Sequence, residues 1–275
     1  MRVHLPDTLA GALALIAGGD ALTPIAGGTD LLVHWPVTPD VHQRAYLDLS
    51  GIDDLRSLRW TDTDLVLGGL TTYWDVISDR RVWAELPLLV DAARQVGAVQ
   101  IQARGTWAGN IVNASPAADG VPVLMAYDAV VVLQSAAGTE HVPIDQMYLG
   151  YRRVRRRPDQ LVVSIVIPRR RYDVQVFEKV GARRAQAIAK VGLAITHSPA
   201  GWRVVAASMA PTVRRCPSVE RLLRDGTPVR SPGDLLPAIA RDVSPIDDVR
   251  STADYRRQVM ARLLYHHLRE TCGWA

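Results

Sequence analysis

The sequence predicts an α+β protein with two unequal parts. Short strand-like runs alternate with helical patterns over the first part of the chain, without an internal repeat or a low-complexity tract. The pattern of residues along the sequence changes after PRRRY at 168–172. We therefore expect a larger domain at residues 1–170 and a smaller one at 171–275. With 48% apolar residues in a chain of 275, there is ample material for a buried core.

The chain begins with a predicted helix and then a strand, a turn and a second helix. LAGALALIAGG at 9–19 has the composition of a core helix, which Asp7 or Thr8 would cap and the two glycines would end. TPIAGGTDLLVHW at 23–35 then predicts a strand, the Gly-rich turn GGTD and a short helix.

The middle of the chain predicts two hairpins and two helices. RSLRW and LVLGG flank TDTD as a hairpin over 56–69. The other expected elements here are a helix capped by Thr71 or Thr72, a helix at 87–96 ending at Gly97, a strand at 128–135 that closes a hairpin through 136–138, and a strand at 161–167.

The last part of the chain predicts strands followed by helices. Strands are expected around 174–180 and 201–208, a helix at 218–225, a Pro/Gly/Asp-rich loop over 226–248, and a closing helix from about Asp254 to Glu270.

The composition indicates a cytoplasmic protein without a membrane span. The apolar stretch at 9–19 is too short to cross a bilayer, and Pro6 and Asp7 lie where a signal peptide carries basic residues. Cys216 and Cys272 are the only cysteines, so neither a disulfide framework nor a Cys-ligated cluster is expected within this chain.

Basic charge is concentrated in arginine, since only Lys179 and Lys190 are lysines among 32 basic residues. The runs RRVRRR at 152–157 and RRR at 169–171 allow a nucleic-acid patch as an alternative, but they lack interleaved aromatic residues and match no binding motif. We favour a solvated face or a subunit contact, and expect no nucleic-acid binding.

Two Gly-rich segments predict a binding site. In AGGTDLL at 26–32, glycines after a strand let backbone amides approach an anion at a helix start, which suits a diphosphate. An ordinary strand-to-helix turn stays open as the alternative. Neither segment contains a P-loop lysine or G-x-G-x-x-G, which argues against a P-loop nucleotidase and a Rossmann domain.

The second segment, GTWAGN at 105–110, is predicted to be a loop that grips phosphate or ring heteroatoms without adding charge. Thr106 offers a hydroxyl and Asn110 an amide. Asp119, after the small-residue run ASPAA at 114–118, can accept from ribose hydroxyls, with a helix cap as the alternative reading.

These segments together carry a family resemblance. AGGTDLL at 26–32 and RGTWAGNIVNASPAAD at 104–119 resemble the FAD-binding (medium) subunit of the molybdenum hydroxylases, which include xanthine dehydrogenase, aldehyde oxidoreductases and carbon monoxide dehydrogenase. FEKVGARRAQAIAKV at 177–191 is similar to a third family segment. The resemblance implies a vanillyl-alcohol-oxidase-type (PCMH-like) FAD-binding domain of two α/β subdomains, followed by a smaller C-terminal domain with an antiparallel sheet and helices.

The resemblance also implies which residues contact FAD. Those expected around the pyrophosphate are Ala26, Gly27, Gly28, Thr29, Asp30 and Leu31, and those on the second wall are Thr106, Trp107, Ala108, Gly109 and Asn110. Asp119 would hold the ribose side, and Val163 and Lys179 would lie near the adenine or isoalloxazine ends. The family usually has glycine where this chain has Ala108, and an aliphatic residue at Trp107, so we expect a slightly different backbone or flavin pose.

The function implied by the resemblance is electron transfer within a complex. A small molecule would be hydroxylated on a molybdopterin large subunit, and electrons would pass through the [2Fe–2S] centres of a small subunit to FAD in this chain. From there they would reach NAD, a quinone or oxygen. The expected assembly is a dimer of heterotrimers, with no metal ligand and no catalytic side chain in this chain.

Two other enzyme classes are weaker alternatives. A stand-alone FAD-dependent reductase of the same fold, of the UDP-N-acetylenolpyruvoylglucosamine reductase type, would need a serine proton donor in a substrate domain, and the similarity at 177–191 argues against it. A metal hydrolase would need clustered ligands, whereas the seven histidines are scattered and His266 and His267 would point to different sides of a helix.

Overall fold

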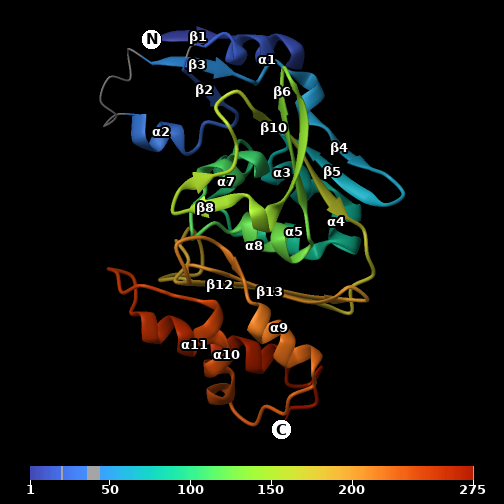
Figure 1. Cartoon of the computed structure of the whole chain (residues 1–275), viewed down its shortest axis with the longest axis vertical. Coiled ribbons are helices and arrows are strands. Elements are labelled where there is room, and N and C mark those ends of the chain that lie inside the picture. The colour runs from blue at the N-terminus through green and yellow to red at the C-terminus, as the bar shows by residue number, and fades with distance from the viewer. Residues whose placement is uncertain (20, 36–43, 275) are drawn as a thin grey trace.

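A computed structural model describes residues 1–19, 21–35 and 44–274 of the chain. Figure 1 shows two stacked parts: the N-terminal part contains the first two sheets, and the C-terminal sheet lies edge-on beneath it with α9, α10 and α11 on its far side. The expected α+β organisation, with strands and then helices in the last part of the chain, is therefore present.

The first elements form a small parallel sheet in the order β1–β3–β2. Helix α1 packs on this sheet through Ala12, Leu13 and Ile16. Thr8 caps the helix, because its hydroxyl accepts a hydrogen bond from the Gly11 amide at 3.2 Å, as predicted. The elements are β1 (Arg2–His4), α1 (Leu9–Ala17), β2 (Leu22–Ile25), α2 (Leu31–His34) and β3 (Ala45–Asp48).

The second sheet has five antiparallel strands in the order β4–β5–β10–β6–β7, and both predicted hairpins belong to it. Helices pack against it around the largest hydrophobic core. The elements are η3 (Asp53–Arg56), β4 (Leu58–Trp60), β5 (Asp64–Gly68), α3 (Tyr73–Ser78), α4 (Arg80–Glu85), α5 (Pro87–Arg94), α6 (Val99–Gln102), α7 (Trp107–Asn113), α8 (Gly120–Ala126), β6 (Val130–Ser135), β7 (Gly138–Pro143), η4 (Ile144–Gln146), β8 (Tyr148–Gly150), β9 (Arg153–Val154) and β10 (Leu161–Pro168).

The third sheet is antiparallel, in the order β11–β12–β13–β14, and it is buried on both faces. Leu193 and Ile195 of β12 face the core formed with α9–α11, whereas Ala194 between them joins the core of the N-terminal part. The elements are β11 (Val174–Val180), β12 (Val191–Ser198), β13 (Gly201–Ala207), β14 (Arg214–Arg215), α9 (Pro217–Arg224), η5 (Pro232–Leu235), α10 (Leu236–Asp242) and α11 (Ala253–Leu268).

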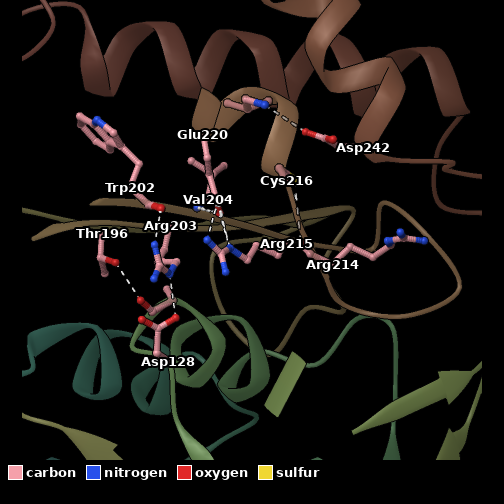
Figure 2. Close-up of polar contacts among 12 residues, drawn as sticks. Asp128, Thr196, Trp202, Arg203, Val204, Arg214, Arg215, Cys216, Glu220 and Asp242 are labelled. Carbon is pink, nitrogen blue, oxygen red and sulfur yellow. Dashed lines mark hydrogen bonds and ion pairs between the residues drawn. The ribbon is translucent and has the colours of Figure 1, made fainter. Parts of the chain in front are cut away.

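Hydrogen bonds connect this sheet to the N-terminal part on one side and to α9 on the other (Figure 2). Toward the N-terminal part, Arg203 Nε donates to Asp128 at 2.7 Å, and the Thr196 hydroxyl donates to the Ala126 carbonyl at 2.8 Å. Toward α9, Glu220 accepts from the Val204 amide at 3.0 Å and from Arg215 Nε at 2.8 Å. The sheet is thus bound to both neighbours by hydrogen bonds as well as by apolar packing.

The predicted loop over 226–248 is wrong, because it contains η5 and α10. Pro232 and Pro237 lie in the first turns of these helices, where the missing amide hydrogen needs no partner. Ala238 and Ile239 are buried in the C-terminal core, which supplies the packing that holds α10. No prediction covered β12. Every helix among the described residues is too short or too polar to span a bilayer.

Candidate functional site

A cleft of about 630 Å³ lies where the two Gly-rich segments meet. All of residues 26–31 line it, together with Thr106, Ala108, Gly109 and Asn110. Strand β10 adds Leu161 and Val162, and other segments complete the walls. The fold therefore brings together two predicted segments that are separated by some 75 residues in the sequence.

The first wall is the turn after β2. Gly28 has φ +72°, a left-handed conformation that favours glycine. A Cβ on Gly27 would lie 1.8 Å from the Arg104 carbonyl oxygen, so only glycine lets the two segments approach this closely. Within the described ranges, the amides of Gly27, Gly28 and Thr29 donate to no protein acceptor. They are available to an anion in the cleft.

The second wall differs from the predicted loop at 105–110, because Trp107 to Asn113 form helix α7. Thr106 caps this helix, and its hydroxyl accepts from the Gly109 amide at 3.0 Å. Trp107 is fully buried beside Tyr73, with 5.1 Å between ring centroids, and does not line the cleft. Ala108 is 6% exposed and lines the cleft.

Two asparagines of α7 carry the polar groups of this wall. The Oδ1 atom of Asn110 is buried and has no hydrogen-bond partner among the described residues. Buried acceptors of this kind are usually satisfied, so an orphaned one in a cleft wall indicates a missing donor. Asn113 Nδ2 donates to Asp30 at 3.1 Å and so links the two walls.

Asp119 and Lys179 lie outside the cleft lining and form an ion pair. Lys179 Nζ lies 2.7 Å from an Asp119 oxygen and donates to the Gln95 carbonyl at 3.0 Å. Asp119 occupies the N-cap position of α8, but its side chain makes no capping bond there. Burial raises the pKa of Asp119 to about 6, even though the Lys179 ammonium favours the ionised form.

Val163 of β10 is also outside the lining, and its neighbours Leu161 and Val162 take that place. Its carbonyl accepts from the Gly69 amide at 2.8 Å. A Cβ on Gly69 would lie 2.4 Å from the Val162 carbonyl oxygen, which keeps this part of the wall close-packed.

Several lining residues were not predicted. Tyr73 lines the cleft, and burial raises its pKa well above the ordinary value, so the phenol stays neutral. Arg152 and Arg156 also line the cleft, although the run at 152–157 was interpreted as a solvated face or a subunit contact. Charge alone gave no signal that would separate these two arginines from their neighbours.

Comparison with protein families gives two matches that cover most of the chain. Residues 1–170 match the FAD binding domain in molybdopterin dehydrogenase, and residues 177–271 match the CO dehydrogenase flavoprotein C-terminal domain. The chain belongs to this flavoprotein family. As the resemblance implied, the flavoprotein chain is an FAD-dependent oxidoreductase subunit.

Related proteins match over almost their whole length. The flavoprotein chain is 29% identical to the carbon monoxide dehydrogenase medium chain of Hydrogenophaga pseudoflava, over 99% of this chain and 96% of the relative. It is 27% identical to the xanthine dehydrogenase FAD-binding subunit of Escherichia coli O157:H7, over 92% and 89% of the two chains.

The fold is also found among solved structures. A chain of carbon monoxide dehydrogenase from Hydrogenophaga pseudoflava superimposes with a TM-score of 0.86 and 26% identity, covering 98% of this chain and 96% of that one. That structure lacks the Mo-pyranopterin moiety of its molybdenum cofactor.

Proposed function

We propose that this chain is the FAD-carrying electron-transfer subunit of a molybdenum hydroxylase complex. It passes electrons from the [2Fe–2S] centres of a partner subunit to an external acceptor such as NAD, a quinone or oxygen. The observation that carries the proposal is the meeting of both Gly-rich segments in one cleft, within a chain that aligns with whole medium subunits.

The cleft residues fit a flavin dinucleotide. The volume of the cleft lies in the range of cofactor sites, roughly 300 to 1,000 Å³. The amides of Gly27, Gly28 and Thr29, which donate to no acceptor among the described residues, suit a diphosphate. The orphaned Asn110 oxygen is an acceptor for a ring or hydroxyl donor of the same ligand.

The residues that hold FAD are proposed to be those of the sequence prediction. Residues 26–31 bind the pyrophosphate. Thr106, Ala108, Gly109 and Asn110 line the second wall, and Trp107 supports that wall from the core. Asp119, Val163 and Lys179 complete the site from behind that wall. Support for the proximity of Asp119 to the second wall comes from the next residue, Gly120, whose Cβ position would lie 2.9 Å from the Asn110 oxygen. Lys179 is paired with Asp119 at 2.7 Å.

When bound, FAD supplies the redox chemistry, and the protein supplies binding, orientation and electrostatics. The amides after β2 fix the anionic part, and the capped start of α7 holds the opposite wall in place. We assign no nucleophile or general base to this chain. Tyr73, whose pKa is raised by burial, contributes a neutral and apolar surface to the cleft.

We infer that an iron–sulfur small subunit and a molybdopterin large subunit accompany this chain in a dimer of heterotrimers in the cytoplasm. Support comes from relatives named as the medium chain of carbon monoxide dehydrogenase and as the FAD-binding subunit of xanthine dehydrogenase. The free thiols Cys216 and Cys272 suit a reducing compartment.

We also infer a two-domain organisation with a boundary near residue 170. The first domain would be of the vanillyl-alcohol-oxidase (PCMH-like) type with two α/β subdomains. The separate three-stranded and five-stranded sheets of the N-terminal part support that subdivision, and the sheet β11–β14 would begin the second domain.

The proposed function is tested by identifying the bound cofactor. Purified protein, or protein incubated with FAD, should show flavin absorbance bands, and mass analysis of the released cofactor should give FAD and not FMN. The native protein should copurify with an iron–sulfur and a molybdopterin subunit, and the isolated chain should show at most weak diaphorase activity. Protein that neither carries flavin nor takes up added FAD would overturn the proposal.

A further inference from the structure

The arginines at 152–157 lie in the β8–β9 hairpin and the segment after it, and they differ in their surroundings. Arg155 and Arg157 pair with Glu140, at 3.2 and 3.6 Å, and Arg157 also lies 3.1 Å from Asp159. Arg152 and Arg156 instead line the cleft. The run is therefore not one uniform charged face, because two of its members have a carboxylate partner and two face a binding site.

Arg152 is held at the cleft by its backbone and its side chain. It has φ +52°, a left-handed conformation that is uncommon for a residue other than glycine. Its Nη1 donates to Asn113 Oδ1 at 3.3 Å, and Asn113 in turn donates to Asp30 at 3.1 Å. This chain of hydrogen bonds connects the hairpin to α7 and to the first wall of the cleft.

Arg156 is half-buried and fixed by the backbone. Its Nη1 donates to the carbonyls of Arg157 at 3.0 Å and Gln160 at 2.6 Å. Burial lowers the pKa of Arg156, as expected for a guanidinium with little water around it. Within the described part of the chain, its Nε and Nη2 atoms have no protein acceptor. The side chain is thus a positioned cation with unused donors.

The charges of the cleft favour an anion. Among its described lining residues, Asp30 is the acidic side chain, and Arg152 and Arg156 are the basic ones, so the lining carries a net positive charge. The diphosphate is the anionic part of FAD at neutral pH. Guanidinium groups bind such oxygens through charge-assisted hydrogen bonds, often with two donors at once.

We propose that Arg152 and Arg156 bind the diphosphate of the dinucleotide from the side opposite the amides of residues 27–29, and that this pair sets the affinity for FAD. The proposal rests on the proposed function, since it takes FAD as the ligand. It adds a cationic side-chain contribution on the cleft lining to the backbone amides of residues 27–29.

The experiment compares FAD dissociation constants of the full chain and its variants at several salt concentrations. Arg152→Gln and Arg156→Gln should each weaken FAD binding by about 10- to 100-fold, the range for a lost charge-assisted contact. The salt dependence of binding should become shallower in both, because fewer ionic contacts are screened. Arg157→Gln is the matched control, since it removes the same charge from a neighbour that does not line the cleft.

Each outcome distinguishes the two proposals. FAD affinity and salt dependence unchanged in Arg152→Gln and Arg156→Gln would overturn the role of the pair while leaving FAD binding intact. An equal loss in Arg157→Gln would show a general charge effect and would also overturn it. A wild-type protein without any FAD affinity would instead overturn the proposed function. Circular dichroism of each variant verifies the fold, and Arg152→Lys, which keeps the charge but not the planar fork, should bind with intermediate affinity.

Discussion

Gly28 is the single residue whose backbone conformation best separates a binding role from a folding role. At φ +72°, a valine would add strain of about 1 to 3 kcal/mol, while its Cβ would meet only ordinary contacts with Leu32 and Ile25. We expect Gly28→Val to keep its fold but to lose more than about tenfold in FAD affinity. Gly226→Val is the control, because Gly226 has φ +61°, its Cβ position meets open space, and it is not a lining residue of the cleft. Fluorescence titration with FAD measures both, and equal affinities would contradict the assignment of the first wall.

Asp119 predicts a pH dependence of stability. Burial raises its pKa to about 6, whereas the unfolded chain titrates near the ordinary value of 3.8. Between these values the folded state holds a proton that the unfolded chain has lost, so the free energy of unfolding falls as pH rises. The fall attributable to Asp119 should reach about 2 to 3 kcal/mol by pH 7. Urea unfolding without FAD at pH 4 to 7 measures it, and Asp119→Asn should lack this component. Parallel pH profiles for both proteins would exclude the raised pKa.

At the scale of the elements, α7 forms one wall of the cleft and begins at a single cap. Thr106→Val removes the hydroxyl that accepts from Gly109, so we expect a loss of about 1 kcal/mol in the free energy of unfolding. We also expect weaker FAD binding, because Thr106 lines the cleft. Thr252→Val removes the equivalent cap of α11, where the hydroxyl accepts from Tyr255 at 3.2 Å, and should affect stability alone. Denaturant unfolding and FAD titration of the two variants separate these effects.

Elements that were predicted correctly have local signals, and those that were missed depend on tertiary contacts. The cap of α1, the two hairpins and the strand at 161–167 follow from capping residues, turn residues and apolar runs. Helix α7 was missed because its glycine and two asparagines are poor helix formers, and burial of Trp107 and Ile111 holds it. Strand β12 lacks polar alternation because both its faces are buried.

The candidate site also has a part with local sequence signals and a part that depends on tertiary contacts. Gly-rich turns can be predicted from a sequence because their conformation or close packing requires glycine, as at Gly27 and Gly28. The place of Arg152 and Arg156 in the cleft lining could not be predicted, because a run of arginines does not reveal which side chains turn toward a cleft. That selection is made by the β8–β9 hairpin and by a backbone turn at Arg152.

At the scale of the whole molecule, the sheet β11–β14 makes the two parts interdependent. Phe177, Ala194 and Val205 belong to the same hydrophobic core as the helices of the N-terminal part. We expect residues 1–170 expressed alone to aggregate, because that apolar face would be exposed to water. Coexpression with residues 171–275 should restore soluble protein. Size-exclusion chromatography measures this, and a monomeric, cooperatively unfolding fragment 1–170 would show that the first part is self-sufficient.

The enclosed position of β12 also determines how its backbone exchanges with solvent. The strand is paired along both edges, with β11 and β13, and covered on both faces. Opening of either covering layer would expose the side chains on one face of β12 only, and it would leave the hydrogen bonds to β11 and β13 in place. In deuterated water its amide protons should therefore exchange only through complete unfolding, and their protection should report the global stability of the chain. The amides of the turn at 27–29 have no acceptor in the part of the chain that the structure describes, so they lie at the opposite extreme. Deuterium uptake there should slow mainly when a ligand occupies the cleft.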